Sequence, residues 1–258
     1  MPEGDTIAHA AARMRPVLEG RVPDEIRTPQ RRHALERWPE RLAGREVVEV
    51  RTHGKHLFLR FAGDLTLHSH LRMTGAWGVY PPGRSPRRSM RRAWLVLRGG
   101  DTEVVQFDGP VLELLTESRT RFDRRLAMLG PDILAPEFDI GRFLARLRAD
   151  DPSRGIGDAL LDQRTVAGIG NIWKSEACFD AAIDPWRPVG QVSDAEARAL
   201  VEVLRPRMQR SAQTGDQTRD RRVFRRQGEP CPRCGSAIRA RRQGDDNRTT
   251  FWCPGCQH

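Results

Sequence analysis

Four of the five cysteines stand in two close pairs near the end of the chain. They form the pattern C-x2-C-x18-C-x2-C and comprise Cys231, Cys234, Cys253 and Cys256. Two such pairs can place four thiolates around one tetrahedral ion, and zinc is the ion that best suits four sulfur ligands. We therefore expect one Zn²⁺ as cofactor. A closed four-sulfur site leaves no open position, so the ion should be structural, and it replaces a core that so short a segment cannot build.

The segment between the two cysteine pairs predicts a β-hairpin. "SAIRARRQ" and "RTTFW" are the expected strands, and "GDDN" is the expected turn. The hairpin carries four arginines, namely Arg239, Arg241, Arg242 and Arg248. Such a face can enter a groove of DNA, but a zinc ribbon can also bind protein or RNA, and the ribbon alone does not separate these alternatives.

The chain begins "MPEGDT", a stretch that could carry a nucleophile. Removal of Met1 before the small Pro2 would free a secondary amine. An α-amine has a pKa of about 8, so a good fraction is unprotonated at neutral pH. Such an amine can attack a carbon like C1′ of a nucleotide sugar and form a Schiff base, and Glu3 beside it could transfer a proton. Taken alone, the stretch is also compatible with an ordinary N-terminus.

Only two lysines, Lys55 and Lys174, occur in a chain that otherwise uses arginine for positive charge. Lysine can give up its proton far more readily than arginine. In "RTHGKHLFLRF", Lys55 follows a glycine turn at the start of a predicted strand and shares the parity of Leu57. This predicts a half-buried amine, and the alternative is a strand-edge charge. For Lys174 we expect chance retention.

The stretch "LLDQRTVAGIGNIWKSEA" predicts a helix, a glycine-containing turn and a second helix. Gly168 and Gly170 permit a close backbone approach, and Asn171 stands where the second helix begins. Backbone N–H groups at a helix start, together with the Asn amide, can hold a phosphate. The alternative is an ordinary helical corner.

The bulk composition favours a polyanionic partner. The 258 residues carry a net charge of +10, and nucleic acid is the commonest partner of so basic a chain, although a basic surface without a partner is also possible. No apolar run of membrane-spanning length occurs, and the first twenty residues lack the apolar core of a secretory signal. We therefore expect a cytoplasmic protein.

The order of predicted elements divides the chain into three parts. A helix over 5–18 precedes short β-rich runs between 46 and 115, which suggest a sandwich or barrel-like sheet. Prolines and glycine interrupt 129–139, and helical periods follow, the last beginning with a capping-box pattern at Ser193 and Glu196. The expected domains are an N-terminal catalytic β-sandwich (1–130), a helical DNA-binding domain (131–222) and a zinc finger (223–258).

Four features in this order, "MPEGDT", "HGKHLFL", "GIGNIWKSEACF" and the terminal "NRTTFWCPGCQH", resemble the formamidopyrimidine-DNA glycosylase / endonuclease VIII family of base-excision repair enzymes. The resemblance covers essentially the whole chain. It implies an α+β fold: an N-terminal β-sandwich with an N-terminal helix, a helical domain with a helix–two-turn–helix, and a four-cysteine zinc-finger hairpin. It also implies a monomer that acts on damaged or abasic double-stranded DNA at the nucleoid.

The resemblance assigns a role to each matching residue. Pro2 resembles the Schiff-base nucleophile and Glu3 the acid that helps release the base. Lys55 falls on the family's β-elimination lysine, Asn171 on the phosphate-contacting asparagine, and Arg248 on the zinc-finger arginine of δ-elimination. A further pair, Arg72 and Met73, lies on a turn that resembles the family's wedge. We expect Met73 to fill the gap left by a flipped base, the alternative being that it packs in the core.

Several departures favour the endonuclease VIII branch, whose preferred lesions are oxidised pyrimidines and abasic sites. The start is "MPEG" rather than "MPEL", and "QFDGPVLELL" lacks the Arg-x-Phe loop of formamidopyrimidine-DNA glycosylases. Thr6 stands where the family often has glutamate, which leaves open how the lesion is gripped and how protons move. Met128 stands where that branch has a second DNA-contacting arginine, so that role is not carried over. A rival hypothesis is a non-catalytic zinc-ribbon protein that binds damaged DNA, and a weaker one is a ribosome- or polymerase-associated ribbon. For Cys178 we expect a buried small side chain.

Overall fold

The computed structural model describes residues 2–219 and 221–258. By their contacts these residues group into two compact units. Of the described residues, the first unit holds Pro2 and Thr6–Ala127, and the second holds Glu3–Asp5 and those from Met128 to His258. Within the described part of the chain, no helix is both long and apolar enough to cross a membrane. The three-domain division at 130 and 222 stays a prediction.

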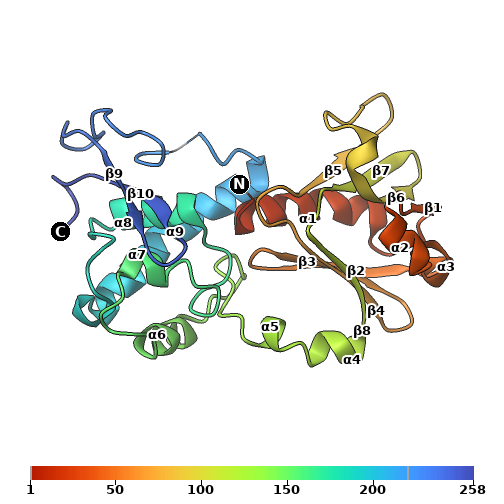
Figure 1. Ribbon diagram of the computed structural model, residues 1–258, viewed down its shortest axis with the longest axis horizontal. Coiled ribbons are helices and arrows are strands. Elements are labelled where there is room, and N and C mark those ends of the chain that lie inside the picture. Colours follow the sequence, from red (N-terminus) through yellow and green to blue (C-terminus); the bar gives the residue numbers. More distant parts are fainter. Residues whose placement is uncertain (1, 220) are drawn as a thin grey trace. The chain divides into compact units, whose positions relative to one another are not determined.

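Two four-stranded antiparallel sheets form the first unit, so the sandwich prediction is confirmed (Figure 1). One sheet has the order β2-β3-β4-β8, with bounds Val47–His53, His56–Phe61, Leu65–His70 and Val111–Thr116. The other has the order β1-β6-β7-β5, with bounds Glu25–Arg27, Ala93–Gly99, Thr102–Phe107 and Ala76–Tyr80.

The core of the first unit joins the sheets to helix α1 (Gly4–Leu18), drawn in red in Figure 1. Ile7, Met14 and Leu18 recur at helical spacing and are buried against inward-facing strand residues such as Leu57 and Leu59. Short helices lie between the strands and after β8, namely α2 (Arg31–Leu35), α3 (Trp38–Leu42), η1 (Met90–Arg92), α4 (Glu117–Arg121) and α5 (Arg124–Ala127).

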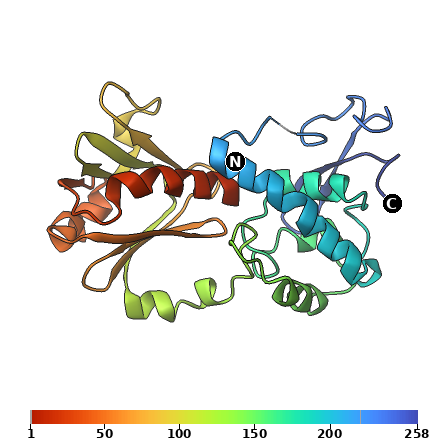
Figure 2. The ribbon, with the colours of Figure 1, turned by 180° about the vertical axis from the view of Figure 1, so that it is seen from behind.

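Helices build the second unit around α8 (Asn171–Asp180) and α9 (Asp194–Thr214), which pack side by side (Figure 2). The predicted capping box is present: Ser193 accepts from Glu196 N, and the Glu196 side chain accepts from Ser193 N. The remaining elements are α6 (Ile140–Arg148), α7 (Ile156–Ala159) and η2 (Val189–Gln191). Nine of the ten residues of α8 are buried, so this helix lies at the centre of its unit.

The predicted hairpin is present as β9 (Arg239–Gln243) and β10 (Arg248–Trp252), an antiparallel pair. Ile238, Cys231 and Cys253 form a small core beneath it together with Phe179 of α8. The cysteine-bearing segment is thus attached to the helix that follows the glycine turn.

The observed elements differ from the predicted ones in three places. The helix expected over 157–166 shortens to α7, because the Asp162 side chain accepts from Arg164 N and turns the chain at that point. Lys55 lies in the two-residue turn between β2 and β3 rather than in the strand. Strands β1 and β8 and the short helices α2, α3, α4 and α5 were not predicted as elements.

Candidate active site

Glu3 is completely buried, and its carboxylate lies against the start of α8. It accepts hydrogen bonds from three backbone N–H groups: Gly170 N at 2.9 Å, Ile172 N at 2.9 Å and Trp173 N at 3.3 Å. The first N–H groups of a helix lack partners within it and attract negative charge. The carboxylate therefore takes the place that a bound anion would occupy at this helix start.

Gly170 is required for this arrangement. A Cβ at position 170 would lie 2.3 Å from the Glu3 carboxyl carbon. Gly168, at φ +105°, adopts a backbone conformation that favours glycine, and its carbonyl accepts from Gly4 N at 2.9 Å. The "GIGN" turn thus holds the residues next to Pro2 through backbone contacts, a function that the sequence pattern alone did not reveal.

Asp5 adds a second anchor for the start of the chain. Its buried carboxylate accepts from the Ser211 hydroxyl at 2.5 Å and from the Gln217 amide at 3.0 Å. Pro2, the residue before Glu3, is partly exposed. The hydrogen bonds of Glu3 and Asp5 therefore restrict the backbone that directly follows Pro2. Met1 lies outside the described residues.

Asn171 and the hairpin residue Arg248 are brought close together in the second unit. The Asn171 amide donates to Thr249 O at 2.8 Å, and Arg248 is the next residue along β10. The Arg248 side chain is 36% exposed and lies 3.5 Å from Asp246. One hydrogen bond therefore links the helix start to the strand that bears Arg248.

Lys174 is the residue whose role the sequence did not indicate. It is completely buried on α8 and donates to the Thr250 hydroxyl and to Gln243 Oε1, the latter at 3.4 Å. Thr250 in turn donates to Gln243 at 2.8 Å. Burial lowers the pKa of Lys174 to about 8. The expectation of chance retention is wrong, because the ammonium joins α8 to both strands of the hairpin.

Burial also accounts for Cys178, one helical turn after Lys174. The thiol is completely buried in the core of the second unit, as predicted. Burial raises its pKa to about 12, so the thiol stays protonated and unreactive at neutral pH.

The four paired cysteines converge on one point. Their sulfur atoms all lie within 4.8 Å of one another. Cys231 and Cys256 are 3.8 Å apart, and Cys234 and Cys253 are 3.4 Å apart. Zinc–sulfur bonds of about 2.3 Å in tetrahedral geometry place sulfurs about 3.8 Å apart. The donor set and its spacing fit a four-sulfur metal site.

Lys55, Arg72 and Met73 belong to the first unit and lie on two turns. The partly buried Lys55 follows Gly54 in the β2–β3 turn, and Arg72 and Met73 follow β4. Arg72 has φ +44°, which is rare for a residue with a side chain and marks a sharp turn. Met73 is 58% exposed, so the alternative that it packs in the core is wrong.

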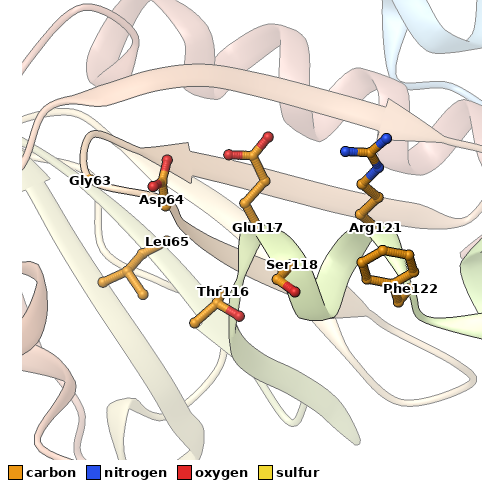
Figure 3. Close-up of a pocket in the computed structure, with 8 residues that line it drawn as sticks. All are labelled: Gly63, Asp64, Leu65, Thr116, Glu117, Ser118, Arg121 and Phe122. Atoms are coloured by element: carbon orange, nitrogen blue, oxygen red, sulfur yellow. The ribbon is translucent and has the colours of Figure 1, made fainter.

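A hollow of about 610 Å³ in the first unit is separate from these turns (Figure 3). Leu65 and Thr116 pair at its end of the β4–β8 ladder, whereas His70 and Val111 pair at the opposite end. The rim carries the exposed ring of Phe122, with the Arg121 guanidinium 5.9 Å from its centroid. None of the predicted site residues lines this hollow.

Comparison with known protein families identifies the family of this chain. Residues 1–110 match the formamidopyrimidine-DNA glycosylase N-terminal domain, residues 129–222 its H2TH domain, and residues 228–258 the zinc finger found in FPG and IleRS. Curated relatives match over the whole chain, one of them at 43% identity. The chain belongs to the formamidopyrimidine-DNA glycosylase / endonuclease VIII family.

Relatives within this family carry the name of its endonuclease VIII branch. "Probable endonuclease 8 2" of Streptomyces coelicolor is 43% identical over all of this chain and 94% of its own length. "DNA-(apurinic or apyrimidinic site) lyase Nei2" of Mycolicibacterium smegmatis is 41% identical over all of this chain and 99% of its own. "Endonuclease 8" of Escherichia coli is 30% identical over the full length of both chains.

Solved structures of the family have the same fold. Lactococcus lactis Fpg in complex with DNA containing N7-benzyl-Fapy-dG superposes with a TM-score of 0.84 at 25% identity, covering both chains completely. The same enzyme with abasic-site DNA gives 0.84 at 24% identity. The predicted α+β fold with a helix–two-turn–helix and a terminal zinc finger is therefore confirmed.

Proposed function

We propose that this protein is a base-excision repair enzyme that acts as a bifunctional DNA glycosylase and abasic-site lyase, with Pro2 as the nucleophile. The observation that carries the proposal is the seat of Glu3 on the three N–H groups of α8. This seat holds an ionised carboxylate on the residue that directly follows Pro2, where the proposed reaction needs a group that can take up and return a proton. The rival hypothesis of a non-catalytic zinc-ribbon protein has no use for a carboxylate buried at that position.

The proposed reaction begins when the Pro2 nitrogen attacks C1′ of the damaged nucleotide. The bond from C1′ to the base breaks and the base leaves with a proton. The bond from C1′ to the ring oxygen O4′ then breaks as O4′ takes up a proton, with Glu3 assisting the proton transfers, and an iminium links Pro2 to the opened sugar. Removal of a C2′ proton, with Lys55 as the assisting group, breaks the bond from C3′ to its phosphate oxygen. A second elimination, assisted by Arg248, releases the 5′ phosphate, and water then frees the sugar fragment from Pro2.

The proposed substrate is double-stranded DNA that contains an oxidised base or an abasic site. A base inside a duplex must be rotated out before Pro2 can reach its sugar. The exposed Met73, next to the sharp turn at Arg72, is the proposed wedge that fills the gap. Asn171 and Arg248 are the proposed phosphate contacts, and we propose Zn²⁺ as the ion that holds the Arg248 hairpin in place.

Borohydride trapping tests the assignment of the nucleophile. We expect the parent protein to form a covalent adduct with abasic-site duplex DNA in borohydride. A chain with an uncleaved extension before Pro2 should bind the same DNA and form no adduct, because its amine is acylated. Removal of the extension by a specific protease should restore trapping. Equal trapping by the extended and the cleaved chains would show that another residue is the nucleophile.

Lesion preference belongs to the same proposal, in which oxidised pyrimidines are favoured over oxidised purines. An incision panel of thymine glycol, dihydrouracil, 8-oxoguanine, formamidopyrimidine and a bare abasic site, in duplex and single strand, would rank them. Clear preference for 8-oxoguanine opposite cytosine would contradict the proposed pyrimidine preference. We further propose a monomer that works in the cytoplasm at the nucleoid, which sedimentation and fluorescence imaging can check.

A further inference from the structure

A row of histidines lies on the outer face of the β2-β3-β4-β8 sheet. His56 pairs with His70, and Phe58 pairs with His68, so these four side chains share one face. Leu57, Leu59 and Leu67 point to the other face and enter the core. The outer face of a sandwich is usually polar but seldom gathers imidazoles, and the proposed reaction assigns no role to His56 or His68.

The rings form a hydrogen-bonded chain that ends on a carboxylate. His56 Nδ1 and His68 Nε2 are 2.8 Å apart, and His68 Nδ1 lies 3.3 Å from Glu113 Oε2. Because a carboxylate accepts, His68 carries its proton on Nδ1, and its bare Nε2 accepts from His56 Nδ1–H. We call His56, His68 and Glu113 the histidine relay. Its direction fixes the tautomer of both rings and leaves His56 Nε2 without a proton.

Burial keeps the relay neutral. Burial lowers the pKa of His56 to about 2 and that of His70 to about 4, and it also lowers the pKa of His68. The charged or titratable groups that face the three rings come from every neighbouring element: His53, Lys55, Arg72, Glu113, Asp123 and Arg125. The Arg125 guanidinium lies 3.3 Å from the Glu113 carboxylate and 2.6 Å from the Asp123 carboxylate. Each of these three charges therefore has a partner of opposite sign.

Metal binding is a weaker explanation for these histidines. Within the described residues, the four cysteines are the group of three or more ligand atoms that converges closely enough to hold an ion. The nitrogen atoms of His56 and His68 face each other rather than a shared point, and His70 Nδ1 accepts from Arg72 N at 3.2 Å. The geometry is that of directed hydrogen bonds.

His56 of the histidine relay and the neighbouring His70 connect the two turns that carry first-unit site residues. His56 is the residue after Lys55, and the rings of His56 and His70 lie 4.6 Å apart at 61°. His70 in turn binds the backbone of Arg72, which begins the Met73 turn. A cavity of about 200 Å³ lies among the three rings, Arg72 and Arg125. The Lys55 turn and the Met73 turn are therefore joined through two contacting imidazoles.

We propose that the histidine relay is a positioning device that holds the Lys55 turn and the Arg72–Met73 turn in one geometry for the elimination step. This inference rests on the proposed function, because it needs Lys55 to act in elimination. The relay works only while its rings are neutral, since protonating both would bring two N–H groups face to face. Glu113 fixes its direction, and the carboxylate acts through the rings without touching DNA.

Two substitutions of the partly exposed Glu113 test the relay in single-turnover scission of a preformed abasic site. Glu113→Gln keeps an oxygen that accepts from His68 Nδ1–H, and we expect its scission rate to stay within about twofold of the parent. Glu113→Leu removes the acceptor and should slow scission about 10-fold, since small misplacements of a catalytic group cost that much or more. Borohydride trapping, which reports the Pro2 step, should be the same in both.

A matched control and a pH series complete this experiment. Thr66→Val alters another buried residue of β4 outside the relay and should leave scission unchanged. Between pH 7 and 9 the lowered pKa values keep the rings neutral, so the ratio of the Gln to the Leu scission rate should stay constant across this range. Equal scission rates for Glu113→Gln and Glu113→Leu, whether fast or slow, would overturn the relay. Failure of the parent to trap would instead contradict the proposed function.

Nuclear magnetic resonance tests the relay without DNA or activity. Long-range nitrogen–proton spectra of the full chain should show Nδ1–H tautomers for His56 and His68 and an Nε2–H tautomer for His70. Glu113→Leu should lose the Nδ1–H tautomer of His68, and Glu113→Gln should keep it. An Nε2–H tautomer of His68 in the parent would overturn the proposal even if the enzyme is active.

Discussion

At the scale of single residues, Glu3 shows how a backbone can prepare a side chain for chemistry. Three N–H donors of one helix start fix both carboxylate oxygens, and Gly170 leaves room for them. The donors hold the group in one orientation beside Pro2, so little reorganisation is needed when a proton is transferred. The same helix start would bind a phosphate in many other proteins. Here it is occupied by the chain's own carboxylate.

Glu3→Gln should separate base release from strand scission. The amide oxygen can still accept from Gly170 N and Trp173 N, which bind one carboxylate oxygen in the parent, so we expect the fold and DNA binding to persist. Release of an oxidised base should fall by about 10²- to 10⁴-fold, the usual loss when a general acid–base group is removed. Scission of a preformed abasic site should fall much less. Parallel assays on a base lesion and on an abasic site check this, and equal losses would contradict it.

Lys174→Met should stabilise the protein in a pH-dependent manner. The pKa of Lys174 is lowered to about 8, below the value near 10.5 in the unfolded chain. Its burial therefore costs stability at pH values below about 8, and this cost fades as the pH rises from 8 to 10.5. The full cost of burying the ammonium corresponds to about 3 kcal/mol. The net stabilisation by Lys174→Met is smaller, because the substitution also removes the hydrogen bonds to Thr250 and Gln243.

Thermal unfolding of parent and Lys174→Met at pH 7 and pH 10 measures this effect. The unfolding temperature of the variant should be higher than that of the parent at pH 7, and this difference should disappear at pH 10. Lys55→Met serves as the control, because Lys55 is only partly buried in a turn and its replacement should show no comparable trend. A Lys174 variant whose relative stability does not change with pH would show that the ammonium is not desolvated.

At the scale of elements, α8 links the start of the chain to the cysteine-held hairpin. Its first turn binds Glu3, Asn171 binds β10, and Lys174 binds both hairpin strands. Farther along, buried Glu176 accepts from Arg207 at 2.9 Å and from three consecutive backbone N–H groups at 222–224. A helix with so many buried polar contacts sets the position of every segment attached to it.

Asn171 and Arg248 should weaken DNA binding in different ways. Arg248→Ala removes a cation, so the slope of log affinity against log salt should decrease by about one. Asn171→Ala removes a neutral donor and its bond to Thr249, so affinity should fall with the slope unchanged. Titrations of abasic-analogue duplex by fluorescence anisotropy at several salt concentrations measure both. Arg239→Ala removes another cation of the same hairpin and serves as the control for Arg248→Ala. A change of the salt slope in the Asn171 variant would contradict the distinction between the two residues.

Local patterns predicted those elements whose signals lie within a few residues. Short β-rich runs between turn residues predicted the strands β2 to β7, and the Ser193–Glu196 spacing predicted the start of α9, because both signals depend on near neighbours. The α7 region failed because the Asp162 side chain competes with helical hydrogen bonds. The contacts of Lys174 and Glu3 could not be predicted, because their partners are 69 or more residues away in the chain.

The histidine relay illustrates the same limit. His56, His68 and Glu113 come from three strands, and only the register of β3, β4 and β8 shows that they share a face. The one signal available in the sequence was the density of histidines in "THGKH" and "LHSH". Composition can indicate such a cluster, but the direction of its hydrogen bonds requires coordinates.

At the scale of the whole molecule, the positive charge and the metal site should both affect DNA binding. The chain carries 44 basic against 34 acidic residues, and many of the arginines are already paired with carboxylates. DNA affinity should therefore depend on a limited number of cations, and four of the arginines lie on the hairpin. Whether the hairpin is folded should then affect DNA binding far more than it affects the remaining architecture.

Removal of the metal should unfold the hairpin and leave the sandwich intact. The small core under β9 and β10 includes Cys231 and Cys253, so loss of the ion leaves Ile238 and Phe179 without support. We expect one zinc per chain by colorimetric release. After chelation, affinity for abasic-analogue DNA should fall at least about 10-fold at low salt, since a folded hairpin is needed to present several phosphate contacts at once.

Circular dichroism and two cysteine variants decide whether the loss is local. The helical signal and the main unfolding transition should survive chelation, because the sandwich core and the α8–α9 core contain none of the four ligands. Cys234→Ala should reproduce the loss of zinc and of binding, whereas Cys178→Ala, in the core of α8, should retain both. Collapse of the whole fold on chelation would show that the metal site stabilises α8 itself, and Lys174, buried between α8 and the hairpin, would then be the first contact to examine.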